Sequence, residues 1–315
     1  MASARSWCRL MPEGIRLTFR PMVEHDLGVT RYVAHEAMDV LDRSQGVAPQ
    51  PWIPIEPRAQ RHLLHTDPGG AWVAELNGVV IGYSMALVRG EIWYLSQLFV
   101  QPDQHGHGIG RELLGRAKAY GRQQGARVFS VVATTSPAGH ALYMRAGMLA
   151  IGVGYRMSGP LAPLEELAAE GDDMTSAEGR DADIAALDRE VFGAERRQDH
   201  AYYLDAAARS GTEASFALIR GGELHGYCHA VADSGFIAPM AAYEPEDQSQ
   251  LLGAAAAWLT QQGVSTGNLF VLSQNRTLMN ALIDAGWCHS RWSFLLTSAP
   301  FAKFDRYHPA GASLL

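Results

Sequence analysis

Three glycines stand close together in the run His105-Gly106-His107-Gly108-Ile109-Gly110. A Pro-Asp turn, Pro102-Asp103, precedes the run. The apolar residues upstream of this turn, Leu98, Phe99 and Val100, are typical of a strand end, and the residues after the run repeat apolar side chains at helical spacing. Glycines let a backbone approach a ligand closely, and the N–H groups of a helix's first turn attract phosphate. The stretch therefore predicts either an anion-binding loop or a tight turn that serves only chain reversal.

The loop lies in a chain of 315 residues, a length that predicts about two domains. Apolar residues make up 47% of it and charged residues 19%, as in ordinary globular proteins. A formal net charge of -7, without a basic run interleaved by aromatics, argues against nucleic acid as a partner and is compatible with a cationic small substrate. Cys8, Cys228 and Cys288 are far apart, so we expect neither a disulfide framework nor a metal site.

Membrane association is not expected either. No apolar run approaches the roughly 20 residues that span a bilayer, and residues 1–14 lack the apolar core of a signal peptide. We interpret residues 1–14 as a frayed leader and expect a cytoplasmic protein, monomer or homodimer.

The elements around the loop alternate between strand and helix patterns, which favours an α/β fold. Between the first helix and the second, residues 42–57 form a Pro-rich connection that carries Trp52 and is a candidate lid over a ligand cleft. The expected elements are a strand at 15–22, helices at 23–38 and 58–66, hairpin strands on either side of Asn77-Gly78, a strand at 91–100, a helix that ends near Gly125, a strand at 127–134, a helix at 137–145 and a strand at 148–157.

This order resembles the GNAT acyltransferase superfamily, and two motifs carry the resemblance. The first is the glycine run, in which His105 stands where the family has Gln or Arg. The second is SPAGHALYMRAGM, residues 136–148, which is similar to the family's N-x-x-A-x-x-L-Y-x-x-x-G-F segment, with Ser136 in the Asn place and Tyr143 in the Tyr place. The resemblance implies an α+β mixed sheet and acetyl-CoA, or another acyl-CoA, as co-substrate.

The second half of the chain repeats the first. Residues 215–232 repeat residues 71–88, with Gly226-Tyr227 in the place of Gly82-Tyr83, and the interval from Asn275 to Gly286 equals that from Ser136 to Gly147. We therefore expect two tandem GNAT-like domains: a catalytic, acyl-CoA-binding domain at 1–160, a linker at 161–173 and a degenerate C-terminal domain at 174–315.

The second copy differs from the first at the loop itself. Its fourth strand passes through Tyr243-Glu244-Pro245-Glu246-Asp247 into Leu251 without a glycine, and acidic groups at a helix start repel pyrophosphate. Leu282 stands where the first copy has Tyr143. The half resembles the non-catalytic partner domain of tandem GNAT proteins, which either shapes the acceptor cleft or is a structural brace.

For the acyl donor, the resemblance implies a pyrophosphate cradle in the loop and a pantetheine arm paired with the backbone near Leu98 and Val100. A distortion in that strand would free groups that polarise the thioester carbonyl. The expected acyl-CoA-binding residues are Leu98, Phe99, Val100, His105, Gly106, His107, Gly108, Ile109, Gly110, Arg111 and Ser136.

For proton transfer, the resemblance makes Tyr143 the acid that reprotonates the thiolate, whereas a core-packing role is the alternative. Tyr94 and Ser96 lie near the expected place of the base and would relay a proton through water. Glu91, at the strand's start, and Glu75, on the hairpin, are alternatives in positions where solvated carboxylates are common. We expect His105 and His107 to contact phosphate rather than move protons.

These residues favour an acyl-CoA-dependent N-acyltransferase that moves an acetyl group to the primary amine of a small molecule by direct attack in a ternary complex. Transfer to a hydroxyl, a thiol or a protein lysine is one alternative. An acyl-CoA-binding sensor that catalyses nothing is another.

Overall fold

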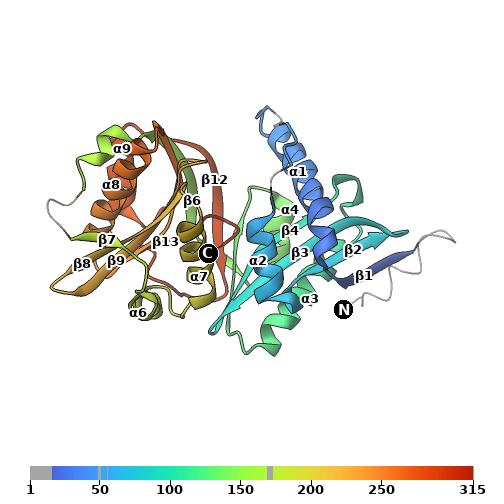
Figure 1. Cartoon of the computed structure of the whole chain (residues 1–315). Helices are drawn as coiled ribbons and strands as arrows, with labels where there is room; N and C mark the ends of the chain where they lie inside the picture. Colours follow the sequence, from blue (N-terminus) through green and yellow to red (C-terminus); the bar gives the residue numbers. More distant parts are fainter. Residues whose placement is uncertain (1–15, 49–50, 55, 169–172, 315) are drawn as a thin grey trace. The chain divides into compact units, whose positions relative to one another are not determined.

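The computed structural model describes residues 16–48, 51–54, 56–168 and 173–314. The predicted leader, Cys8, and parts of the Pro-rich connection and of the linker lie outside the described residues. The chain divides into two compact units, residues 1–129 and 130–315, and each is described by itself (Figure 1). The predicted domain limits at 160 and 174 stay a prediction.

Unit 1 contains an antiparallel sheet in the order β1-β2-β3-β4. Its strands are β1 (Leu17–Pro21), β2 (Trp72–Leu76), β3 (Val79–Arg89) and β4 (Ile92–Val100). Asn77 and Gly78 have φ values of 52° and 83°, which is the backbone that an Asn-Gly hairpin turn needs. The predicted hairpin is confirmed.

Helices cover both faces of this sheet (Figure 1). Ser84 contacts α3 (Ile109–Gln123), because its hydroxyl donates to the Leu113 carbonyl at 3.5 Å. The neighbouring Tyr83 lies near Arg31 of α1 (Leu27–Ser44), as successive strand residues point to opposite faces. The helix predicted at 58–66 is α2 (Arg58–Thr66), with the expected limits.

The first helix starts and ends later than predicted. Residues 24–26 form a 3-10 turn, in which the Asp26 carboxylate accepts the Val23 N–H at 2.8 Å and pairs with Arg20. These bonds hold the chain in a non-helical entry, and α1 then continues to Ser44, past the predicted end at 38, before Gly46 adopts a φ of 74°. The Pro-rich connection is correspondingly shorter.

In unit 2 the strands follow the order β5-β12-β6-β11-β10-β9-β8-β7, with β13 paired to β10. The last strands of the two sequence repeats are β6 in the first and β12 in the second, and they are exchanged. β12 lies between β5 and β6 of the first repeat, and β6 lies between β12 and β11 of the second. The strands are β5 (Val128–Ala133), which crosses the division, β6 (Leu149–Pro160), β7 (Met174–Ser176), β8 (Glu213–Arg220), β9 (Glu223–Val231), β10 (Phe236–Ala242), β11 (Thr266–Leu272), β12 (Cys288–Thr297) and β13 (Tyr307–His308).

This exchange explains why β6 runs to Pro160, beyond the predicted end at 157. Residues 158–160 pair with residues 266–268 of β11, so the chain stays extended up to the linker. The two repeats are therefore joined by backbone hydrogen bonds as well as by the chain.

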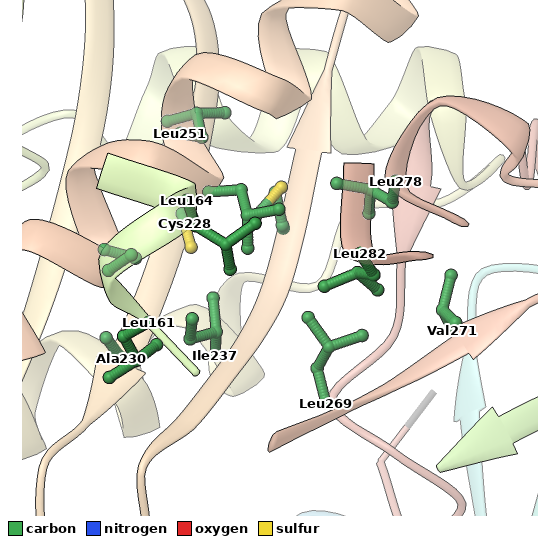
Figure 2. Packing of buried hydrophobic residues seen from close by; sticks show 14 of the residues in the cluster. Leu161, Leu164, Cys228, Ala230, Ile237, Leu251, Leu269, Val271, Leu278 and Leu282 are labelled. Carbon is green, nitrogen blue, oxygen red and sulfur yellow. The ribbon is translucent and has the colours of Figure 1, made fainter. Parts of the chain in front are cut away.

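Six helices are described in unit 2: α4 (Pro137–Arg145), α5 (Ala162–Glu165), α6 (Asp181–Val191), α7 (Arg197–Arg209), α8 (Pro245–Gln261) and α9 (Arg276–Asp284). Figure 2 shows the core between α8, α9 and the sheet, where Leu251, Leu278 and Leu282 are fully buried. Leu161 and Leu164, in the described part of the predicted linker, are fully buried in the same core. Each such leucine contributes about 1.5–3 kcal/mol, so this part of the linker is a folded element.

Candidate functional site

The glycine loop presents bare backbone at the start of α3. Gly106 and Gly108 have φ values of 84° and 80°, and Gly108 is the N-cap of the helix. A Cβ added at either glycine would meet nothing within 4 Å, so the space in front of the loop is open. The first amides of α3 have no intrahelical acceptor, and with the helix dipole they favour an anion there.

Both histidines of the loop bind backbone carbonyls. His105 Nε2 lies 2.9 Å from the Val100 oxygen, and His107 Nδ1 lies 3.3 Å from the Gln104 oxygen. Since a carbonyl only accepts, we assign the proton to these two nitrogens. The rings thus order the loop, and their contact with phosphate stays a prediction.

An apolar cluster holds the loop against the sheet. Ile109 and Leu113 of α3 pack on Ala74, Ile81 and Val100, which come from β2, β3 and β4. Ile109 is 3% exposed, so the helix start is anchored directly beneath the open glycines. Gly110 is half-buried in the helix's first turn, and Arg111 is exposed.

The fourth strand carries a bulge. Met85 of β3 pairs with Gln97 and Ala86 pairs with Leu95, which leaves Ser96 as the extra residue on β4. The expected distortion is present, two residues before the Leu98–Val100 segment to which we assigned the pantetheine contacts. A bulge re-aims backbone groups beside a site, and Ser96 lies at that point with 9% of its surface exposed.

Tyr94 lies just before the bulge and is fully buried. It pairs with Leu87 of β3, on the face that also carries Tyr83. Leu98, Phe99 and Val100 follow the bulge and pair regularly with Ser84, Tyr83 and Gly82.

The remaining predicted residues lie on α4, in unit 2. Ser136 is the N-cap of that helix, where its hydroxyl oxygen accepts the Gly139 N–H at 3.4 Å. Tyr143 is 8% exposed, and burial raises the pKa of its phenol well above the usual range. Tyr143 therefore keeps its proton at neutral pH, as an acid must before it donates.

The two alternative carboxylate bases are engaged in ion pairs. Glu75 accepts two hydrogen bonds from Arg20, at 2.9 and 2.7 Å. Glu91 is 60% exposed and lies 3.1 Å from Arg127. Neither is poised to take a proton from a substrate, which agrees with their interpretation as structural or solvated groups.

On the face opposite α3, polar and aromatic groups meet over the strands. The Tyr83 hydroxyl donates to Gln97 Oε1 at 2.9 Å, and the Tyr83 ring lies 5.8 Å from that of Phe99. Burial raises the pKa of Tyr83, and the nearby charge of Arg31 opposes this only in part. The sequence marked Tyr83 only as part of a repeat.

Trp52, in the described part of the Pro-rich connection, rests on α1. Its ring lies 5.7 Å from Tyr32 and 5.3 Å from His35, and the Arg31 guanidinium carbon lies 5.6 Å from it. Sequence reasoning missed Arg31 and His35, although their four-residue spacing places both on one side of a helix. The lid role of the connection stays a prediction.

Two further features bear on the class of protein. Across the part of the chain that the structure describes, no helix is long and apolar enough to cross a membrane. In the same residues, His, Cys, Asp and Glu side chains form no group of three that would hold a metal ion.

Comparisons with known proteins bear on the family. Residues 36–148, which include the bulged strand, the glycine loop and Tyr143, match the profile of the "Acetyltransferase (GNAT) family". This chain carries a GNAT acetyltransferase domain. The protein is therefore an acyltransferase of the class that uses an acyl-CoA donor. No curated protein sequence matches it.

Solved structures extend the GNAT likeness over both halves. A putative acetyltransferase from Pyrococcus horikoshii is 16% identical, covers 95% of this chain and 94% of its own, and has a TM-score of 0.71. A GCN5-related N-acetyltransferase from Sphaerobacter thermophilus is 16% identical, with coverage of 91% and 96% and a TM-score of 0.64. A tandem GNAT protein from the clavulanic acid biosynthesis pathway is 17% identical, with coverage of 90% and 99% and a TM-score of 0.59. The predicted tandem GNAT fold is confirmed.

Proposed function

We propose that this acyltransferase moves an acetyl group from acetyl-CoA to the primary amine of a small molecule, by direct attack in a ternary complex. The observation that carries the proposal is the succession, within unit 1, of a bulged β4 and an open glycine loop at the start of α3. The expected location is the cytoplasm, and the expected assembly is a monomer or homodimer.

Donor binding rests on backbone groups. The space at Gly106 and Gly108 is open, and the first amides of α3 have no intrahelical acceptor, so the backbone N–H groups from His107 to Arg111 would suit a pyrophosphate. The strand from Leu98 to Val100 would pair with the pantetheine arm. The bulge at Ser96 would direct a backbone group at the thioester carbonyl, where developing negative charge needs a donor.

Proton transfer involves two separate groups. Tyr143 is protonated and would donate its proton to the departing thiolate; burial, which raises the pKa of the phenol above the value of about 8.5 for an ordinary thiol, works against this transfer. The amine enters as an ammonium with a pKa near about 10, so its proton must leave before attack. Water beside Tyr94 and Ser96 would carry that proton, because neither Glu75 nor Glu91 is available.

The acyl-CoA sensor remains the second candidate, and one observation favours it. Both carboxylates that we considered as bases are held in ion pairs. Release of CoA in the presence of panels of small amines, thiols, alcohols and lysine peptides separates the readings. Turnover with small amines supports the proposal, whereas calorimetric binding of acetyl-CoA without turnover on any acceptor supports the sensor.

A further inference from the structure

A serine, a histidine and a glutamate form a chain of hydrogen bonds on strands β8 and β9 of unit 2. The Ser215 hydroxyl lies 2.8 Å from His229 Nδ1, and His229 Nε2 lies 3.2 Å from a carboxylate oxygen of Glu213. Ser215 pairs with His229 across the two strands, and Glu213 stands two residues before Ser215, so the three side chains point to one face of the sheet. The strand register therefore brings a nucleophile, a base and a carboxylate together.

The direction of these hydrogen bonds follows from the chemistry of the carboxylate. An ionised carboxylate only accepts, so we assign the imidazole proton to Nε2, which donates it to Glu213. Nδ1 then carries a lone pair, and the Ser215 hydroxyl donates to it. His229 is thus placed to take the Ser215 proton, and Glu213 is placed to stabilise the imidazolium that forms.

The three residues differ in their access to solvent. His229 is 2% exposed and Glu213 is 8% exposed, whereas Ser215 is half-buried. The Tyr203 ring of α7 packs 5.1 Å from the His229 ring. The base and the carboxylate are therefore enclosed by the fold, and the nucleophile is the member of the three that is most open to solvent.

The first repeat shows that the fold does not require these polar groups. When the repeats are aligned on their Gly-Tyr pairs, Ser215 corresponds to Ala71 and His229 corresponds to Met85. Ala71 is 1% exposed and Met85 is fully buried, so the first copy fills the equivalent positions with apolar side chains. The bond between Ser215 and His229 is therefore a feature of the second copy alone.

We propose that Ser215 is a nucleophilic serine that reacts with carboxylic esters, with His229 as its base and Glu213 as the group that orients the base. Ser215 Oγ forms a bond to the ester carbonyl carbon while its proton passes to His229 Nδ1, and the alcohol leaves with that proton. Water, deprotonated by His229, then cleaves the acyl-serine ester, and Ser215 recovers its proton. The site lies in unit 2 and does not rest on acyl-CoA binding by the glycine loop.

The test treats the full-length chain with a fluorophosphonate, which bonds to activated serines and releases fluoride, and locates the adduct by mass spectrometry. Ser215 should be labelled, and Ser215→Ala should lose this adduct. His229→Gln, which keeps a hydrogen-bonding group beside Glu213 but removes the base, should slow the labelling about 100-fold or more. Ser176 of β7 is the matched control, because it is exposed and its hydroxyl oxygen accepts the Glu178 N–H at 3.2 Å.

Labelling of Ser215 but not of Ser176, with slow labelling in His229→Gln, supports the proposal. Labelling of neither serine, or of both at the same rate, overturns it, and so does an unchanged rate in His229→Gln with the thermal unfolding midpoint maintained. If that midpoint falls, the comparison of Ser215 with Ser176 in the unmodified chain decides. Release of p-nitrophenol from p-nitrophenyl butyrate tests the ester directly: a rate no higher than that of Ser215→Ala overturns the ester as substrate.

Discussion

The fourth strands of the two repeats, β4 and β10, are equivalent, but they differ in what pairs with them. Gly82 pairs with Val100 in the first copy, and Gly226 pairs with Ala242 in the second. By this register, the Leu98–Val100 segment that we assign to pantetheine corresponds to residues 240–242. Both fourth strands also carry a bulge just before that segment, at Ser96 and between Ile237 and Met240.

In the second copy the edge is already occupied. Met240 pairs with His308 and Ala241 with Tyr307 of β13, and the Ala242 N–H donates to the Arg306 carbonyl at 3.0 Å. The chain's own strand thus takes the hydrogen bonds that a pantetheine arm would make. The helix that follows starts with Glu246 and Asp247 instead of a glycine loop.

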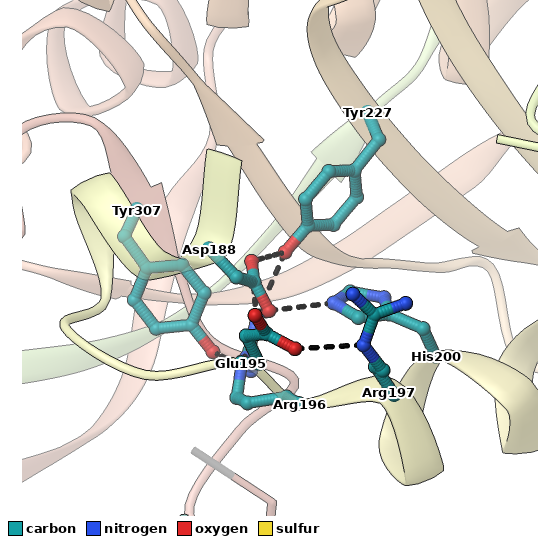
Figure 3. Close-up of polar contacts among 7 residues, drawn as sticks. All are labelled: Asp188, Glu195, Arg196, Arg197, His200, Tyr227 and Tyr307. Atoms are coloured by element: carbon teal, nitrogen blue, oxygen red, sulfur yellow. Dashed lines mark hydrogen bonds and ion pairs between the residues drawn. The ribbon is translucent and has the colours of Figure 1, made fainter. Parts of the chain in front are cut away.

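The tyrosines of the repeated Gly-Tyr pair differ in the same way. Tyr83 bonds the neutral Gln97, whereas the Tyr227 hydroxyl donates to Asp188 at 2.7 Å. Asp188 also binds Arg196 at 2.8 Å and His200 at 2.6 Å. Figure 3 shows how these side chains gather around the Asp188 carboxylate. In the second copy, a buried polar network therefore surrounds the tyrosine that corresponds to Tyr83, and the helix after the fourth strand begins without the glycines of the first copy.

The largest effect that tests this comparison is on stability. Asp188→Ala would leave Arg196 buried without its carboxylate, which should lower the free energy of unfolding by about 3–5 kcal/mol. Glu75→Ala, in the partly exposed network of unit 1, should cost about 1 kcal/mol or less. Urea denaturation followed by circular dichroism measures both. Equal losses would show that burial of the second copy's network adds nothing to its contribution to the free energy of unfolding.

The filled edge also predicts a pH dependence. Burial lowers the pKa of His308 on β13 to about 4, with a smaller opposing effect of the Ile237 backbone, whereas an unfolded histidine titrates near about 6.5. The unfolded state therefore binds the proton first, and stability should fall between about pH 6.5 and pH 4, by up to about 3 kcal/mol. Burial raises the pKa of Asp188, but Arg196 and His200 hold it well below its usual range, so its contribution is lost only below about pH 4.

Denaturation across this pH range, with His308→Gln beside the unmodified chain, measures the effect. In the His308→Gln variant, the free energy of unfolding should change less between pH 6.5 and pH 4 than in the unmodified chain. An identical slope in both proteins would remove His308 as its source.

Two glycines with the same backbone geometry flank α3 and allow a controlled test of the glycine loop. Gly108 precedes α3 and Gly125 follows it; both have a positive φ, and a Cβ at either meets nothing within 4 Å. Leucine at each position should strain the backbone by about 1–2 kcal/mol, but only Gly108→Leu should abolish or weaken acetyl-CoA binding, by about tenfold or more. Calorimetry decides, and unchanged affinity in Gly108→Leu would refute the loop assignment.

Tyr143 and Leu282 occupy equivalent places, so the hydroxyl distinguishes the copies chemically. Tyr143→Phe should lower kcat about tenfold or more with little change in KM, because the proton donor is lost and packing is kept. Steady-state CoA release measures both constants, with Tyr227→Phe as the control that should leave kcat unchanged. An unchanged kcat in Tyr143→Phe would show that this side chain has only a core-packing role.

The sequence predicted these features where the chemistry is local. Asn77-Gly78, the α2 limits, the glycine loop and the absence of a loop before α8 all follow from residues adjacent in the chain. The tandem fold followed from a repeat of the same local patterns.

The sequence did not predict which strands distant in the chain pair with each other. The exchange of β6 and β12 depends on which strands meet, and alternation of side chains does not specify a partner. The start of α1 was misplaced for a related reason, since Asp26 pairs with Arg20 of the preceding strand.

The smallest effect concerns the two repeated tyrosines directly. Tyr227→Phe removes hydrogen bonds to the charged groups Asp188 and Arg196 and should cost about 1.5–3 kcal/mol, whereas Tyr83→Phe removes one bond to a neutral amide and should cost about 1 kcal/mol. Both rings stay buried, so packing loss is matched between the variants. Urea denaturation measures the difference. Equal costs would mean that the charges around Tyr227 contribute no more than Gln97 does, and the two copies would then differ in shape rather than in the strength of their buried contacts.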